Sequence, residues 1–229
     1  MFHWFFCLSL LFNLSFAQDD LYTDILVVGG GASGTAAGIQ AARMGASVIL
    51  VEETTWLGGM LTSAGVSAVD GNYHLPAGLW GEFKDGLVKY YGSDTVLQSG
   101  WVSNVLFEPS AGDKVLKAIA GKEKNLSIFY ESVLKDIHRE KDLWQASVKT
   151  KEGLRTIHAK LVIDATELGD VARSCGVKYD VGMDSRFVTG ETIAPAKANH
   201  IIQDLTYVAI LKDYGRDMTM PRPAGYDSS

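Results

Sequence analysis

The first pattern of apolar and polar residues that predicts folded structure consists of two short apolar runs separated by a segment of helical character. DILVVG (24–29) and ASVILVEE (46–53) contain consecutive apolar, often β-branched residues, which is typical of strands buried on both faces. The segment between them, GGASGTAAGIQAARMG, consists mostly of small residues that are compatible with a helix, and it ends at Gly45. Glycine is common just past the end of a helix. The pattern therefore predicts a strand, a glycine-rich turn, a helix and a second strand.

The middle of the chain changes from a helical period to a strand period. Apolar residues recur at helical spacing in residues 75–92, and residues 109–121 predict another helix. From about 125 to 160, apolar and polar residues alternate in VLKDIHRE, LWQASVKT and GLRTIHA, with short polar turns between them. This alternation predicts a β-meander, in which His138 and His158 face solvent. The whole pattern indicates an α/β fold.

Two apolar patterns lie outside these elements. LVIDA (161–165) is apolar throughout up to its aspartate and predicts a further buried strand. Residues 205–211 alternate again and predict a strand.

The first 17 residues, MFHWFFCLSLLFNLSFA, are apolar and aromatic almost throughout and are followed by a polar QDD. Ser15 and Ala17 place small residues where a signal peptidase reads them. We expect a secretory signal peptide at 1–17, cleavage before Gln18, and export to the periplasm or the exterior. A membrane anchor and a buried N-terminal element are the alternatives, but the run is shorter than the roughly 20 residues of a spanning helix, so we expect no stable membrane span.

Charge and cysteine content exclude several classes of function. The formal net charge is −6, and the chain has no basic run, so we expect no nucleic-acid partner. The only cysteines are Cys7, inside the predicted signal peptide, and Cys175, which we expect to be a small buried residue. The absence of a C-x-x-C motif excludes disulfide-reductase chemistry and leaves no evident iron–sulfur cluster. No spacing of ligand residues suggests a metal site.

The turn after the first strand, VVGGGASG, has the spacing G-x-G-x-x-G in the context that a dinucleotide requires. Gly29 allows the tight turn, Gly31 lets the backbone approach a pyrophosphate, and Gly34 lets the helix pack close to the sheet. Ala32 and Ser33 complete the turn, so that the positive end of the helix faces the phosphates.

An acidic residue closes the second strand at the position expected for a ribose ligand. Glu52 follows Gly34 by 18 residues, and its carboxylate can accept hydrogen bonds from both ribose hydroxyls of an adenosine. The same charge would repel a 2′-phosphate, which disfavours NADP. The neighbouring Glu53 would point to the opposite face of the strand.

The segments that follow resemble known flavoproteins. TTWLGGMLTSAG places the pair Gly58-Gly59 six residues after Glu52, and this arrangement, together with V-x-V-x-G-G-G-x-x-G, resembles the glutathione reductase-like superfamily with two dinucleotide-binding domains. D-A-T-E-x-G-D (164–170), GGMLTSAGVSAVDGN and PAGLWGEF are similar to a family of bacterial FAD-dependent oxidoreductases. The superfamily has Ala-Thr-Gly where this chain has Ala165, Thr166 and Glu167. The resemblance covers residues 22–229.

The resemblance implies FAD as the cofactor and a Rossmann-like FAD-binding parallel sheet with an inserted β-meander. It implies that Met60 lies near the isoalloxazine ring and that the backbone of Val133 pairs with the adenine. From the glycine motif, the acidic residue and the resemblance together, the expected cofactor-binding residues are Gly29, Gly31, Ala32, Ser33, Gly34, Glu52, Gly58, Gly59, Met60, Val133, Ala165, Thr166 and Asp170.

No residue is identified as catalytic. His74, in DGNYHLPAG, is the candidate, because a histidine in a loop can carry protons near neutral pH or form a covalent flavin link. An ordinary surface histidine is the alternative.

We expect three segments: the signal peptide at 1–17, a FAD-binding domain at 18–179 and the truncated beginning of a substrate domain at 180–229. Members of the superfamily return to the FAD-binding domain near their C-terminus, and no such segment follows Asp170. The chain therefore resembles the N-terminal part of a longer protein, with the C-terminal half as its partner. The expected function is a FAD-dependent oxidoreductase acting on an unknown small molecule. The alternatives are a non-catalytic nucleotide-binding module or degenerate fragment and a flavin-free NAD-dependent dehydrogenase, against which Gly58-Gly59 and the meander argue.

Overall fold

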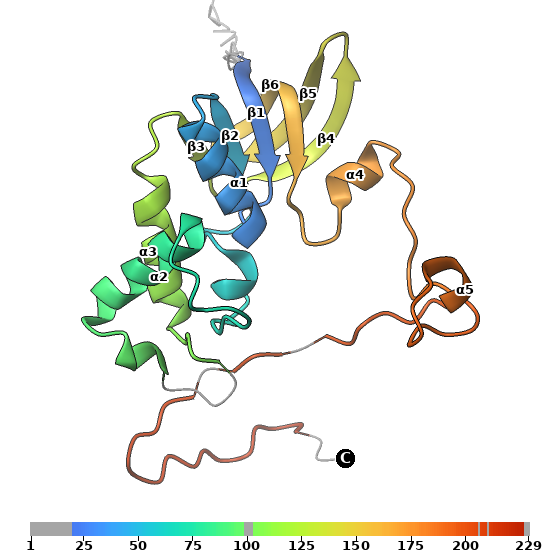
Figure 1. Cartoon of the computed structure of the whole chain (residues 1–229). Coiled ribbons are helices and arrows are strands. Elements are labelled where there is room, and N and C mark those ends of the chain that lie inside the picture. Colours follow the sequence, from blue (N-terminus) through green and yellow to red (C-terminus); the bar gives the residue numbers. More distant parts are fainter. Residues whose placement is uncertain (1–19, 99–102, 206, 210, 227–229) are drawn as a thin grey trace, which may run out of the picture. The chain divides into compact units, whose positions relative to one another are not determined.

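The structure, a computed structural model, describes residues 20–98, 103–205, 207–209 and 211–226 (Figure 1). The predicted signal peptide lies outside the described residues and stays a prediction. The chain divides into two compact units, and we describe each by itself. The sheet unit comprises Met1–Leu57 and Leu116–Lys178, and the helical unit comprises Gly58–Val115 and Tyr179–Ser229. Residues 58–115 thus cluster with the C-terminal segment, whereas the sequence pattern assigned them to the FAD-binding domain, and the domain limits stay a prediction.

The sheet unit contains a six-stranded mixed sheet in the order β3-β2-β1-β6-β5-β4 (Figure 1). The neighbours β3, β2, β1 and β6 pair in parallel, and β6, β5 and β4 pair antiparallel. The expected α/β fold with a parallel sheet and a meander is therefore confirmed. The strands are β1 (Leu21–Val28), β2 (Val48–Val51), β3 (Leu126–Phe129), β4 (Val133–Glu140), β5 (Leu143–Thr150) and β6 (Gly153–Asp164).

The last meander strand and the apolar run LVIDA form one continuous strand, β6, although the sequence predicts two elements. The first half of β6 pairs with β5 and its second half pairs with β1, so a single strand joins the meander to the parallel sheet. The expectation of complete burial was wrong, because Leu161 is 61% exposed. An apolar run shows that a strand can be buried, but the elements that cover it decide whether it is.

Helix α1 (Ala32–Arg43) packs on the sheet through its small residues. Gly38 is buried, and a Cβ at this position would lie 3.2 Å from Leu50 Cδ1 and 3.3 Å from Leu126 Cδ1. The missing side chain therefore lets α1 approach β2 and β3 closely. A further cluster of buried residues includes Leu26, Ile49, Val148 and Ile157. These contacts hold the carboxyl ends of β1 and β2 and the start of α1 in one place.

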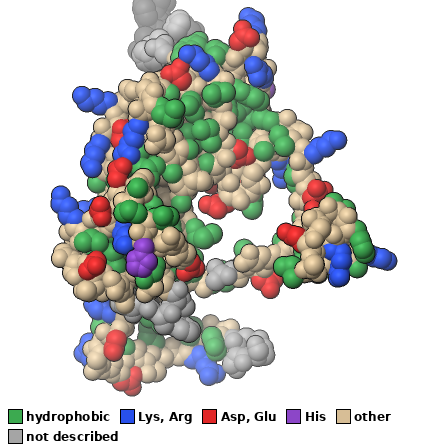
Figure 2. Space-filling model, viewed as in Figure 1, with side chains coloured by type: hydrophobic (Ala, Val, Ile, Leu, Met, Phe, Trp, Pro, Cys, Tyr) green, Lys and Arg blue, Asp and Glu red, His purple; other side chains and the backbone are tan. Residues whose placement is uncertain are grey.

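The helical unit confirms the two predicted helices as α2 (Gly78–Tyr91) and α3 (Pro109–Ala120), whose last turn belongs to the sheet unit. The short 3-10 helices η1 (Gly59–Leu61) and η2 (Thr95–Gln98) lie in the same unit. Phe83 and Phe107 pack edge to face with ring centroids 5.3 Å apart. In Figure 2, acidic and basic side chains are interspersed over the visible surface.

The C-terminal segment contains little regular structure. The short helix α4 (Asp170–Ser174) precedes this segment, and the short helix α5 (Arg186–Thr189) lies within it. The described residues of the predicted strand 205–211 form no strand, because no neighbouring segment pairs with them. In the parts of the chain that the structure describes, no helix has the length and apolarity needed to cross a membrane.

Two expectations about single side chains were also wrong. Only 14% of the His158 side chain is exposed, because Tyr22 stacks on its ring at 4.7 Å and Asp20 lies 3.0 Å from its Nε2 atom. His138 does face solvent, as expected. Cys175 is exposed rather than buried, because α4 is only five residues long and buries only Val171.

Candidate functional site

The glycine-rich turn lies where the carboxyl ends of β1, β2 and β6 meet, since Val28 pairs with both Val51 and Asp164. Gly29 has a φ of +100°, which side chains rarely adopt. A Cβ at Gly29 would also lie 2.3 Å from the carbonyl oxygen of Ala165, in the connection that follows β6. Gly29 is therefore required both for the turn and for the close approach of a second loop.

Gly34 has the tightest surroundings of the motif. A Cβ at this position would lie 1.8 Å from the carbonyl oxygen of Gly29 and 2.9 Å from the Cβ of Ala165. Thr35, the next residue, donates its hydroxyl proton to the Gly30 carbonyl oxygen at 2.8 Å. These contacts hold the first turn of α1 directly against the glycine-rich turn, as the motif predicts.

The N-terminus of α1 carries no cap of its own. Gly31 is its N-cap residue, no side chain of the described residues accepts a hydrogen bond there, and the first turn contains no acidic residue. Ala32 and Ser33 are exposed. The first N–H groups of a helix and its dipole favour an anion at this end. An adenine dinucleotide would present its pyrophosphate to such a site.

Glu52 is buried and holds the other side of the turn. Its Oε2 atom accepts a hydrogen bond from the Gly30 N–H at 2.7 Å, and its Oε1 atom accepts two from Thr54, at 2.8 Å from the backbone and 2.6 Å from the hydroxyl. These bonds keep the carboxylate beside the turn, where a ribose would lie. Glu53 is exposed.

Sequence reasoning missed Gly30. A Cβ at Gly30 would lie 2.7 Å from Glu52 Oε2 and 2.9 Å from Glu52 Cβ, so a side chain would push the carboxylate away. The G-x-G template leaves this position free. The available signal was the run of three adjacent glycines, of which Gly30 is the middle one.

The loop before Val133 lies beside Glu52. The N–H of Ser132 donates to the Glu52 carbonyl oxygen at 2.9 Å, and the N–H of Glu131 donates to the Thr54 carbonyl oxygen at 3.0 Å. Val133 then begins β4. The structure therefore brings the expected adenine position and the expected ribose ligand into neighbouring segments.

The connection from β6 to α4 is organised by Asp164, which sequence reasoning also missed. Its Oδ1 atom accepts hydrogen bonds from the backbone (3.0 Å) and the hydroxyl (2.7 Å) of Thr166, and its Oδ2 atom accepts one from the Ala172 N–H at 2.8 Å. Partial burial raises the pKa of Asp164, but these hydrogen bonds outweigh it and hold the pKa below its usual value. Thr166 Oγ1 also accepts the Asp170 N–H at 2.8 Å, while the Asp170 side chain is exposed.

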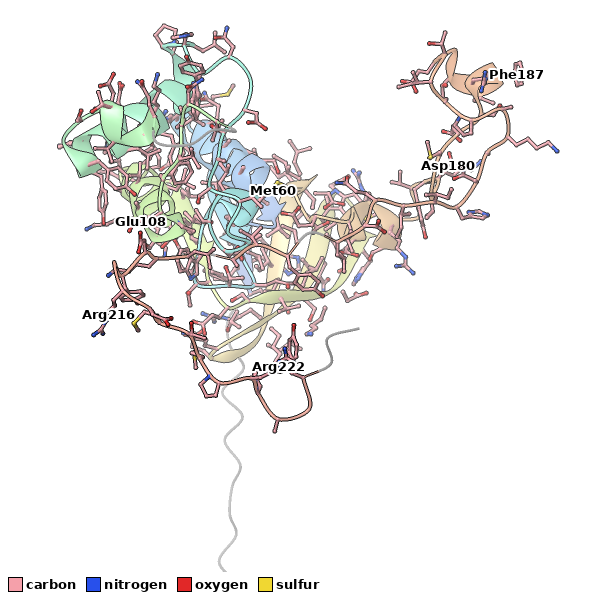
Figure 3. All side chains as sticks on the ribbon, turned by 90° about the horizontal axis from the view of Figure 1, so that it is seen from below. Met60, Glu108, Asp180, Phe187, Arg216 and Arg222 are labelled. Carbon is pink, nitrogen blue, oxygen red and sulfur yellow. The ribbon has the colours of Figure 1, made fainter. Side chains whose placement is uncertain are left out.

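The remaining expected residues belong to the helical unit. Gly58 and Gly59 have positive φ angles of 106° and 52°, which suits the glycine pair at the start of η1. Met60 lies on η1 and is 57% exposed (Figure 3). His74 is exposed, and its ring centroid is 4.1 Å from that of Tyr73. Its environment is that of a loop histidine, and no acidic partner holds it within the described residues.

The parts of the site in the sheet unit fit an adenine dinucleotide on their own geometry. The uncapped α1 N-terminus offers the anion site, Gly31 leaves its approach free of a Cβ, and Glu52 is buried beside it. In the described residues, no group of three or more histidine, cysteine or acidic side chains is arranged to hold a metal ion.

Comparisons with solved structures show the same fold. A p-nitrophenol 4-monooxygenase from Pseudomonas putida is 15% identical, with a TM-score of 0.52 over 72% of this chain and 45% of that chain. A flavoprotein/dehydrogenase from Cytophaga hutchinsonii is 21% identical, with a TM-score of 0.51 over 74% of this chain and 48% of that chain. The chain thus spans less than half the length of these two proteins. A search of curated proteins gave no match.

A family model described as "FAD dependent oxidoreductase" matches residues 24–227, which include every expected cofactor-binding residue. This match confirms the expected cofactor, FAD, and the resemblance to FAD-dependent oxidoreductases. The chain belongs to the family of FAD-dependent oxidoreductases.

Proposed function

We propose that the sheet unit binds FAD and that the protein carries out a flavin-mediated oxidation or reduction of a small molecule, as a member of the glutathione reductase-like superfamily. The observation that carries this proposal is the uncapped N-terminus of α1 beside the buried carboxylate of Glu52. The helix N-terminus offers N–H groups to a pyrophosphate, and the carboxylate of Glu52 offers acceptors to a ribose. Bound FAD would supply the redox chemistry, and the protein would supply position and electrostatics.

The proposed contacts follow the three parts of the cofactor. Gly29, Gly31, Ala32, Ser33 and Gly34 would surround the pyrophosphate. Glu52 would bind the adenosine ribose, and the backbone of Val133 would pair with the adenine. The hydrogen bonds of Ser132 and Glu131 to the Glu52–Thr54 segment support this neighbourhood.

Further proposed contacts come from two other segments. Ala165, Thr166 and Asp170 would line the site from the β6–α4 connection, whose approach to Gly29 supports their inclusion. Gly58, Gly59 and Met60 would follow the cofactor toward its flavin ring, a proposal that rests on the resemblance of the Gly-Gly loop.

We also propose that the protein is exported after cleavage before Gln18, which the apolar N-terminal sequence supports. His74 remains the proposed proton carrier, supported by its exposed position in a loop. Residues 180–229 are proposed to begin a substrate-binding region.

A flavin titration of the purified protein tests the proposed site. The wild type is expected to keep the visible absorption of flavin after addition of FAD and desalting. Glu52→Gln should raise the Kd for FAD about 10- to 100-fold, because the charged acceptor of the ribose hydroxyls is lost. Glu53→Gln is the matched control, since Glu53 is the exposed neighbour. An equal loss of affinity in both variants, or a wild type that binds NAD and no FAD, would contradict the proposal.

A further inference from the structure

A carboxylate from outside the glycine motif lies against the N-terminus of α1. Gly31 has no Cβ, and the atom nearest to the position that a Cβ would take is Glu167 Oε1, at 3.3 Å. No other heavy atom beyond the chain neighbours of Gly31 lies within 4 Å of that position in the described part of the chain. The side of Gly31 on which a Cβ would lie therefore faces a negative charge.

The position of Glu167 follows from the anchoring of its loop. Glu167 lies in the turn between the end of β6 and the start of α4. Before it, the N–H of Ala165 donates to the Val28 carbonyl oxygen at 2.8 Å. After it, the N–H of Ala172 donates to Asp164 at 2.8 Å. Because the turn is tied to β1 on one side and to α4 on the other, the Glu167 side chain is presented to the start of α1.

The charge of Glu167 is not neutralised by a neighbour. Within the described residues, Glu167 forms no ion pair with a lysine, arginine or histidine. The other carboxylates of the site, Glu52 and Asp164, accept hydrogen bonds from the backbone and from threonine side chains, whereas no group in the described part of the chain forms such a bond with Glu167. An unpaired anion beside an uncapped helix N-terminus receives the favourable field that a phosphate would otherwise receive.

We propose that Glu167 acts as an anionic gate at the N-terminus of α1, where its carboxylate competes with the FAD pyrophosphate and lowers the affinity for the cofactor. This inference rests on the proposed FAD site. When FAD binds, the exposed side chain turns away toward solvent, while the anchored backbone of the turn stays in place. Glu167 thus sets the affinity for the cofactor, and it acts on the phosphate groups of the ligand.

The test compares three ligands on flavin-free protein: FAD, ADP and adenosine. Glu167→Gln keeps the size of the side chain and removes its charge. We expect this variant to bind FAD and ADP about tenfold more tightly than the wild type, which corresponds to about 1.4 kcal/mol. Adenosine carries no phosphate, so its affinity should stay unchanged. The difference for FAD should shrink as the salt concentration rises from about 0.02 to about 0.5 M, because salt screens exposed charges.

Glu152→Gln is the matched control. Glu152 precedes β6 and Glu167 follows it, so the 12-residue strand separates the two charges. This control should leave all three affinities at their wild-type values. Glu167→Ala provides a second variant, which should also tighten FAD and ADP, and circular dichroism should show that both Glu167 variants are folded.

The outcomes separate the inference from the proposed function. If the wild type binds FAD and both Glu167 variants bind FAD and ADP no more tightly than the wild type does, the proposed role of Glu167 is contradicted. The proposed FAD site is then still supported. An equal gain for adenosine would overturn the gate as well. If neither the wild type nor the variants bind FAD or ADP, both proposals fall together.

Discussion

Replacing Gly34 with alanine is expected to lower the free energy of unfolding by about 3 kcal/mol and to abolish the retention of FAD. The added Cβ would lie 1.8 Å from the Gly29 carbonyl oxygen, so the backbone of the turn or the start of α1 must move. Either movement displaces the helix N-terminus that would bind the pyrophosphate. Denaturant unfolding followed by circular dichroism measures the first effect, and titration with FAD measures the second.

Gly38→Ala is the control for this substitution, because it makes the same change in the same helix. There the added Cβ meets only the ends of two leucine side chains, at 3.2 and 3.3 Å, and these can shift. Alanine also favours the helix by about 1 kcal/mol over glycine, which offsets the crowding. We expect this variant to remain within about 1 kcal/mol of the wild type and to bind FAD. A Gly34 variant that is as stable and as competent as the Gly38 variant would disprove the close-packing argument.

Replacing Asp164 with alanine is expected to cost about 2 kcal/mol of stability and to weaken FAD binding at least about tenfold. The substitution removes the acceptor of three hydrogen bonds that fold the connection between β6 and α4. The same connection supplies Ala165, which packs against Gly29 and Gly34. Thermal and denaturant unfolding should be compared with Asp142→Ala, since Asp142 is exposed in the turn between β4 and β5.

The effect of Asp164 should depend on pH with a defined sign. Its pKa is lowered in the folded protein, so its stabilising contribution is fully present above the ordinary aspartate value, near 3.8, and is lost as the pH falls through the lower folded value. The stability difference between the wild type and Asp164→Ala should therefore stay constant from about pH 7 to pH 5 and should shrink as the pH falls from about 5 toward 2. A difference that stays constant over the lower range would refute the role of the charged form.

The wild type itself should lose stability in the same range for an additional reason. Hydrogen bonds from Lys160 and Ser47 lower the pKa of Asp24 in β1, so this carboxylate also resists protonation in the folded state. Comparing the two proteins at each pH cancels this shared contribution, provided that the sites act independently. The comparison then reports on Asp164.

The βαβ unit was predictable because its signals are local. Consecutive apolar residues, three adjacent glycines and a run of small helix formers each determine the backbone within a few positions. The meander was predictable for the same reason, since alternation in β4, β5 and the first half of β6 marks faces of a sheet. The described residues of the strand expected at 205–211 form no strand, because alternation alone provides no pairing partner.

Residues whose roles depend on distant partners could not be predicted in this way. Gly30 matters because its backbone nitrogen lies 2.7 Å from Glu52 Oε2, and the two residues follow different strands, β1 and β2. His158 is mostly covered because Tyr22, on a neighbouring strand, stacks on it. Asp164 was interpreted only as part of a motif, and its three hydrogen bonds show it to be the anchor of the turn.

The sequence by itself determined the order of the elements, the dinucleotide motif and the membership of a FAD-dependent family, because periodicity and motif spacing act over short stretches of chain. The tertiary structure decided how the three carboxylates of the site differ. Glu52 is buried between Gly30 and Thr54, Asp164 holds a turn in place, and Glu167 lies beside Gly31 with no ion-pair or hydrogen-bond partner among the described residues. All three are the same chemical group, and only the neighbours that the sheet brings to each one set its charge environment and its role.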